Sequence, residues 1–119
     1  MRLLLIFSIL ILDQGTKYFF GGQLNQGVSF SFLQISPIIL VVMQLVLLFL
    51  VARVMRSNIC AGLILGGGIS NLVDRVLFGG VRDWMTLPVI GLRNNLADWA
   101  IVFGLLWYTI SHENRNRRE

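Results

Sequence analysis

The sequence has few side chains that act as nucleophiles or metal ligands. It contains one cysteine, Cys60, and one histidine, His112. A single cysteine excludes an internal disulfide and a cysteine-based metal site. The lone histidine lies in a basic segment near the carboxyl end, so neither a serine–histidine pair nor a histidine-rich metal site is indicated. We expect Cys60 to be a small apolar side chain in the interior.

Charged residues are also scarce. Only 13% of the 119 residues are charged and 55% are hydrophobic, whereas an ordinary soluble domain has about 25% charged residues. The composition therefore predicts a single integral membrane domain that covers residues 1–119. A net charge of +4 could suggest nucleic acid as a partner. The basic residues are scattered and flank apolar runs, however, which favours a role in orientation and no nucleic-acid partner.

Four apolar segments predict an all-α membrane protein with four transmembrane helices. They cover about residues 3–20, 37–54, 59–76 and 95–110. The first segment could instead belong to a cleaved signal peptide, but no small-x-small site follows it. Pro37 is well placed for a first helical turn. Gly62, Gly66 and Ser70 recur every four residues, and such a stripe lets another helix approach closely.

The connections between these segments are polar and short. Between the first two helices, alternation from Val28 to Phe32 predicts a short β-like segment along the membrane interface. After the fourth helix, residues 111–119 are rich in arginine and asparagine. We expect them to form a solvated basic tail.

The basic residues predict the orientation. Six lie on one side of a four-span arrangement and four on the other. The six are Arg2, Arg53, Arg56, Arg115, Arg117 and Arg118, and the four are Lys17, Arg75, Arg82 and Arg93. The positive-inside rule then places both termini in the cytoplasm. All the aspartates consequently lie at the outer end, namely Asp13, Asp74, Asp83 and Asp98.

Two of these aspartates are candidates for catalysis. An aspartate at mid-bilayer depth costs about 2.5–3.5 kcal/mol on insertion scales, so it usually has a function. Asp98 is expected about one turn inside the fourth helix, close to Asp83. Two neighbouring carboxylates share a proton, so one can polarise water while the other protonates the leaving group of an amide. Alternatively, Asp74 and Asp83 only pair with Arg75 and Arg82 at the interface.

Four segments of the chain, in order, resemble the motifs of one protein family. They are Asp13-Gln14-Gly15-Thr16-Lys17, then Asn25-Gln26-Gly27-Val28-Ser29-Phe30-Ser31, then Gly67 to Arg75 with Val81-Arg82-Asp83-Trp84, and finally Asn94-Asn95-Leu96-Ala97-Asp98. With these segments the chain resembles lipoprotein signal peptidase (signal peptidase II), an intramembrane aspartyl peptidase of bacteria. It would be an unusually short member, because only seven residues separate Lys17 from Asn25.

The resemblance implies a substrate, a location and a set of site residues. The substrate is a prolipoprotein with a diacylglyceryl-modified cysteine, which is cut before that cysteine without a metal or cofactor. The enzyme lies in the bacterial inner membrane, in contact with lipid, with its site near the periplasmic face. The resemblance makes Asp83 and Asp98 the catalytic pair. It gives substrate-binding or supporting roles to Asn25, Gly27, Asn71, Asp74, Arg75, Asn95, Asp13 and Lys17.

The chain departs from the family pattern at three positions. Ser70 stands where glycine is usual, Trp84 where phenylalanine is usual, and Asn94 where phenylalanine is common. Two other functions stay open on the sequence. One is a metal-dependent membrane phosphotransferase that uses clustered aspartates on a lipid head group. The other is a non-catalytic relative that binds lipidated peptides.

Overall fold

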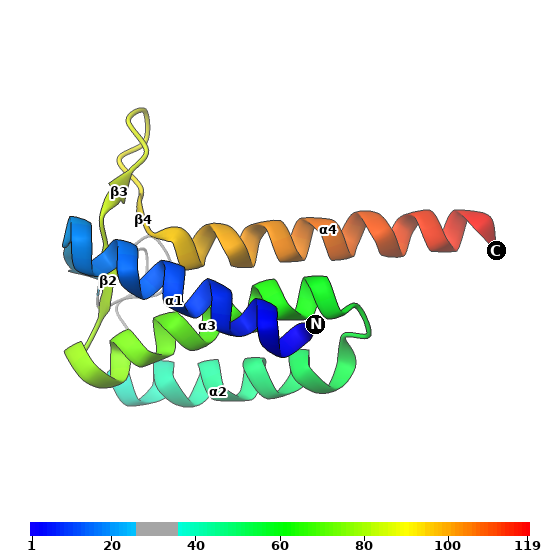
Figure 1. Ribbon diagram of the computed structural model, residues 1–119, viewed down its shortest axis with the longest axis horizontal. Coiled ribbons are helices and arrows are strands. Elements are labelled where there is room, and N and C mark those ends of the chain that lie inside the picture. Colours follow the sequence, from blue (N-terminus) through cyan, green and yellow to red (C-terminus); the bar gives the residue numbers. More distant parts are fainter. Residues whose placement is uncertain (26–35) are drawn as a thin grey trace.

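The computed structural model describes residues 1–25 and 36–119. In this part of the chain, four helices lie side by side and short strands gather at one end of the bundle (Figure 1). The helices are α1 (Arg2–Phe20), α2 (Pro37–Val54), α3 (Asn58–Phe78) and α4 (Leu96–Arg118). The strands are β1 (Gln23–Asn25), β2 (Val81–Asp83), β3 (Met85–Thr86) and β4 (Arg93–Asn94).

Helix α3 is the centre of the bundle and contacts α1, α2 and α4. Its small residues explain the close approach of α1. A Cβ atom added at Gly62 would lie 2.8 Å from the side chain of Leu5, and one at Gly66 would lie 2.8 Å from that of Ile9. Larger side chains at these two positions would push the helices apart. The predicted small-residue contact surface is therefore confirmed, and its partner is α1.

The outer helices expose apolar side chains, as lipid-facing helices do. Phe19 in α1 is 86% exposed and Ile38 in α2 is 76% exposed. Among the described residues, α1, α2 and α3 are long and apolar enough to cross a membrane. Helix α2 begins at Pro37, as the sequence predicts. The chain is thus a mostly helical membrane protein, and a membrane crossing by α4 stays a prediction.

The fourth helix is longer than the sequence predicts. It continues to Arg118, whereas the predicted span ends at about residue 110 and is followed by a solvated basic tail. The last turns are exposed, and Arg117 Nη2 lies 2.8 Å from Glu113 Oε1 one turn earlier. Pairs at this spacing stabilise solvated helical turns. The expected tail is therefore exposed but helical.

Two pairs of short strands lie at the end of the bundle where Asp83 and the start of α4 lie. Strand β1 pairs antiparallel with β2, with Gln23 opposite Asp83, and β3 pairs antiparallel with β4. Gly22 precedes β1 with a φ of 123°, and a Cβ atom there would lie 2.6 Å from the main-chain oxygen of Asp83. A glycine is required at this position because of both the backbone conformation and the contact. The predicted strand at Val28–Phe32 lies outside the described residues.

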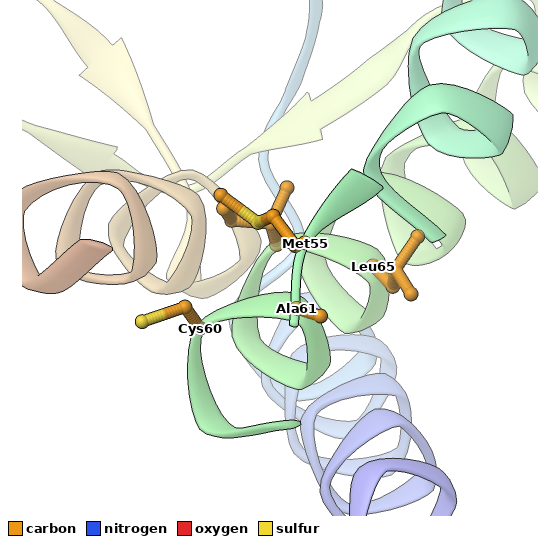
Figure 2. Packing of buried hydrophobic residues seen from close by; sticks show 5 residues of the cluster. Met55, Cys60, Ala61 and Leu65 are labelled. Carbon is orange, nitrogen blue, oxygen red and sulfur yellow. The ribbon is translucent and has the colours of Figure 1, made fainter. Parts of the chain in front are cut away.

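The opposite end of the bundle is closed by a small apolar cluster. It consists of Met55, Cys60, Ala61, Ile64 and Leu65. Met55 lies over the start of α3, and Cys60 and Leu65 point away from that helix in opposite directions (Figure 2). Cys60 is completely buried, which confirms its predicted place in the interior.

Candidate active site

The first turn of α4 positions Asp98. Asn95 is the N-cap residue, and its Oδ1 accepts a hydrogen bond from the main-chain N of Asp98 at 3.0 Å. In return, Asp98 Oδ2 accepts one from the main-chain N of Asn95 at 3.2 Å. This reciprocal arrangement is a capping box, which satisfies two N–H groups that the helix leaves free. Asp98 is the N3 residue of α4, so it lies about one turn from the helix start, as predicted.

The same asparagine also contacts the second candidate acid. Asn95 Nδ2 donates a hydrogen bond to Asp83 Oδ1 at 2.8 Å. Asp83 is the last residue of β2 and is only 5% exposed, while Asn95 is completely buried. One residue, fixed at a helix start, therefore contacts both carboxylates: its side-chain amide donates to Asp83 and its main-chain N donates to Asp98.

Both aspartates line a cavity of about 260 Å³ between α2, α3 and the start of α4. Its polar end contains Gln44, Asn71 and Arg75 beside the two acids, and its long wall is apolar. The apolar lining residues are Leu40, Met43, Leu47, Leu48, Val51, Ile64, Gly68, Val81 and Ile101. An apolar cavity with a few convergent polar groups is typical of a binding site for an apolar ligand with one reactive polar part.

Arg75 is held by a residue of α2. Its Nη1 donates to Gln44 Oε1 at 2.5 Å, and Gln44 Nε2 donates to the main-chain oxygen of Gly68 at 2.8 Å. The guanidinium group also interacts electrostatically with Asp83 and Asp98. A fixed cation thus lies in the cavity that contains the two acids.

Asn71 is positioned by a lysine from α1. Asn71 Nδ2 donates to Asp98 Oδ1 at 2.9 Å, and its Oδ1 accepts from Lys17 Nζ at 3.0 Å. An ammonium group can only donate, so the amide oxygen of Asn71 must face Lys17 and its NH₂ group must face Asp98. Lys17 is completely buried. A residue of α1 therefore fixes the hydrogen bond that Asp98 receives from α3.

Lys17 belongs to a set of four charges, of which three are completely buried and Arg82 is partly exposed. Its Nζ lies 2.5 Å from Asp13 Oδ2 and 3.2 Å from Asp74 Oδ2. Arg82 Nη2 lies 3.0 Å from Asp74 Oδ1. Two cations and two carboxylates balance, and such balance makes the burial of charge tolerable. The pairing proposed for Asp74 at the interface is thus present in part, with Arg82 and Lys17 as its partners.

Asp13 connects three helices. Its Oδ2 accepts from Ser70 Oγ in α3 at 2.5 Å, and its Oδ1 accepts from the main-chain N of Ala97 in α4 at 2.8 Å. An exposed Asp13–Lys17 pair would contribute about 0.3–0.5 kcal/mol, but both residues are completely buried. Their role is to tie the start of α4 to α1 and α3.

Sequence reasoning missed Gln14, Gln44 and Ser70 as members of these networks. Gln14 Nε2 donates to Ser70 Oγ at 2.9 Å and to Asp74 Oδ1 at 3.0 Å. Its Oε1 accepts from Arg82 Nη2 at 2.6 Å. The available signal was the presence of amide side chains inside apolar helices, where polar groups need partners.

The remaining predicted residues are placed only in part. Asn25 lies in β1 opposite Val81, two residues before Asp83. Gly27 lies outside the described residues. Within residues 1–25 and 36–119, no three histidine, cysteine or acidic side chains are grouped so that they could hold a metal ion.

Comparison with known proteins points to one family. Residues 22–112 match the family described as signal peptidase (SPase) II. A lipoprotein signal peptidase of Caldicellulosiruptor bescii is 34% identical over 130 residues, which cover 89% of this chain and 86% of the relative. One from Caldanaerobacter subterraneus subsp. tengcongensis is 29% identical, with 89% and 91% covered. One from Anaplasma marginale is 36% identical over 92 residues, and the match spans about half of that relative, 52%.

Two solved structures share the fold. Both are described as bacterial membrane enzymes. The first has a TM-score of 0.87 at 19% identity and covers 99% of this chain and 90% of its own. The second has a TM-score of 0.75 at 20% identity, with 92% and 90% covered. At sequence identities this low, the structural similarity shows a shared fold and nothing more.

Proposed function

Because this chain belongs to the signal peptidase II family, we propose that it is an intramembrane aspartyl endopeptidase with Asp83 and Asp98 as its catalytic pair. The family match confirms the predicted type of peptidase. Relatives are named lipoprotein signal peptidase, so the substrate is a prolipoprotein. The bond cut is the one before its diacylglyceryl-modified cysteine.

One observation carries the catalytic assignment. Asn95 donates hydrogen bonds to both carboxylates, from Nδ2 to Asp83 and from its main-chain N to Asp98. Two acids so close to one residue share a proton, because two negative charges in a poorly hydrated cavity repel each other. The pair then has one ionised and one protonated member, which is what acid–base catalysis of amide hydrolysis requires.

The proposed reaction uses both members of the pair. The ionised carboxylate takes a proton from water while the water oxygen attacks the carbonyl carbon of the scissile bond. The protonated carboxyl group then gives its proton to the amide nitrogen as the carbon–nitrogen bond breaks. Arg75 and Asn71 line the same cavity and can donate hydrogen bonds to the substrate backbone. No metal ion or cofactor takes part in these steps.

The cavity suits a lipid-anchored substrate. Its long wall is formed by apolar residues of α2, and the acids lie at one end. An acyl chain or an apolar signal sequence can lie along α2, between α2 and α4, while the bond to be cut reaches the acids. The proposed peptidase therefore acts at the edge of the bilayer, on a residue presented by membrane lipid.

We further propose that α4 is the fourth span and that residues 1–119 form one domain. Both termini then lie in the cytoplasm, and the strands and acids lie at the periplasmic face. In support, Arg2 donates to the main-chain oxygen atoms of Ala52 and Met55, at the end of the bundle opposite the acids. Its charge therefore lies at the same end as the other basic residues that are predicted to be cytoplasmic, which agrees with the positive-inside rule.

Cysteine labelling tests this orientation. Cys60 is completely buried, so a Val89→Cys variant adds one reactive thiol at a position that is 95% exposed. An impermeant maleimide should label it in intact spheroplasts. If the new cysteine reacted only after lysis, the orientation would be the opposite of the one proposed.

The catalytic proposal is tested with a lipidated precursor peptide and purified protein in detergent. Asp83→Asn and Asp98→Asn should each abolish cleavage, and a chelator should change nothing. Glu113→Gln, which removes a carboxylate far from the cavity, is the matched control and should keep the full rate. An unlipidated peptide should be cut poorly. Full activity in either aspartate variant would refute the pair, and chelator sensitivity would favour the metal-dependent alternative.

A further inference from the structure

A second cavity lies at the end of the bundle opposite the acids. Its volume is about 300 Å³, and it lies between the turn that joins α2 to α3 and the C-terminal half of α4. Its lining residues are Val54, Arg56, Ser57, Cys60, Tyr108, Ser111, His112 and Arg115. None of them takes part in the candidate active site.

The cavity exists because the C-terminal part of α4 extends beyond the first residue of its neighbour α3. The two helices pack tightly at Gly104, where an added Cβ atom would lie 3.1 Å from the main-chain oxygen of Cys60. At this end of the bundle α3 begins at Asn58, while α4 continues past the turn that precedes it (Figure 1). Tyr108 and His112, stacked with ring centroids 5.9 Å apart, form the wall on the α4 side. Cys60, which is completely buried, also lines the cavity.

Two arginines from different segments meet at this cavity. Arg56 comes from the α2–α3 turn and Arg115 from α4. Neither makes an ion pair or a hydrogen bond within the described part of the chain. No acidic side chain lines the cavity, and Glu113 on the same helix pairs with Arg117. The cavity therefore has two uncompensated positive charges.

Hydroxyl groups complete a set of donors. Ser57 Oγ accepts a hydrogen bond from the main-chain N of Cys60 at 3.2 Å, so its own O–H group is available to donate. Ser111 supplies a second hydroxyl from the α4 side. Two guanidinium groups and two hydroxyls match the acceptor oxygens of a phosphate group, which arginine binds through two parallel hydrogen bonds.

We propose that this cavity binds the phosphate group of an anionic phospholipid. The phosphate oxygens are bound by Arg56 and Arg115. The acyl chains follow the exposed apolar surfaces of α2 and α4, where Val54 is 66% and Trp107 is 57% exposed. Basic pockets between membrane helices are known to bind such head groups. The proposal does not depend on the catalytic assignment.

Native mass spectrometry of the purified full chain in detergent tests the proposal. The protein is mixed with dioleoyl phosphatidylglycerol, with dioleoyl phosphatidylcholine or with inorganic phosphate, and the bound fraction is measured. The test variant is Arg56→Gln with Arg115→Gln. The control is Arg53→Gln with Arg118→Gln, which removes the same charge from the same end but from residues that do not line the cavity.

Phosphatidylglycerol should bind better than phosphatidylcholine, and the test variant should weaken its binding about tenfold or more. The control should change binding by about twofold or less. Equal losses in both variants would overturn the proposal, because they would indicate general attraction to a basic surface. Equal binding of the two lipids would also overturn it. If inorganic phosphate binds as strongly as phosphatidylglycerol, the cavity binds phosphate but the proposed phospholipid is refuted as its ligand. Unchanged melting temperatures establish that both variants are folded.

Discussion

Replacement of Lys17 with methionine should destabilise the bundle strongly. The new side chain has a similar length and no charge. The change removes the contacts of Nζ with Asp13 at 2.5 Å and with Asp74 at 3.2 Å, and the hydrogen bond to Asn71 at 3.0 Å. Asp74 keeps Arg82 as a partner. Asp13 keeps its neutral donors but loses the cation beside it.

Two estimates of the loss can be compared. Removal of one partner from a buried ion pair costs about 3–5 kcal/mol, because it leaves a charge buried without compensation. A polar hydrogen bond inside a membrane protein contributes only about 0.6 kcal/mol on average. The side chains of Lys17, Asp13 and Asp74 are all completely buried, so the larger figure applies. We expect Lys17→Met to lower the free energy of unfolding by at least about 3 kcal/mol.

The measurement is unfolding by sodium dodecyl sulfate in mixed micelles, followed by tryptophan fluorescence. A second substitution, Asp13→Asn, added to Lys17→Met should recover about 1–2 kcal/mol, because it removes the unpaired charge. The control is Arg117→Gln, whose pair with Glu113 is largely exposed, at 74% and 60%, and should cost under about 0.5 kcal/mol. If Lys17→Met cost less than about 1 kcal/mol, the ion-pair reasoning would be wrong.

Two further predictions concern the start of α4. Asn95→Ser keeps an N-cap oxygen but loses the amide that donates to Asp83 at 2.8 Å, so peptide cleavage should slow about tenfold or more while the melting temperature changes little. Cleavage at the full rate would show that the contact is dispensable. Gly67→Ala should lower stability by about 1–3 kcal/mol in the same micelle assay, since the added Cβ would lie 2.5 Å from the main-chain oxygen of Ala97. Gly15→Ala, which meets nothing within 4 Å, should instead stabilise α1 by about 0.5–1 kcal/mol, and a loss there would contradict the role given to packing.

The helices that face lipid could be predicted well from the sequence. Their apolar runs have sharp ends, and Pro37 marks the first turn of α2. The end of α4 could not, because its last turns have no apolar pattern and their helical state depends on exposed polar residues such as Glu113 and Arg117. Hydropathy measures transfer into lipid, not helix formation in water.

The sequence predicts that Asp83 and Asp98 lie close together, and both line one cavity, but it does not predict the side chains that support them. The cost of aspartates in a membrane and the motif resemblance both pointed to these two acids, and the Asn95-x-x-Asp98 spacing is itself a cap signal. The contacts of Gln14 with Ser70 and Asp74 could not be predicted. Sequence spacing relates residues within one helix, and these contacts join α1 to α3. The contact between Asn95 and Asp83 likewise depends on how the β3–β4 hairpin folds back, which no local pattern fixes.

The double use of Asn95 has a consequence for the biogenesis of the enzyme. The side chain that starts the last helix also donates to Asp83, so the proposed pair of acids comes together only when α4 has docked. Under the proposed assignment, we expect cleavage to begin only after α4 has docked.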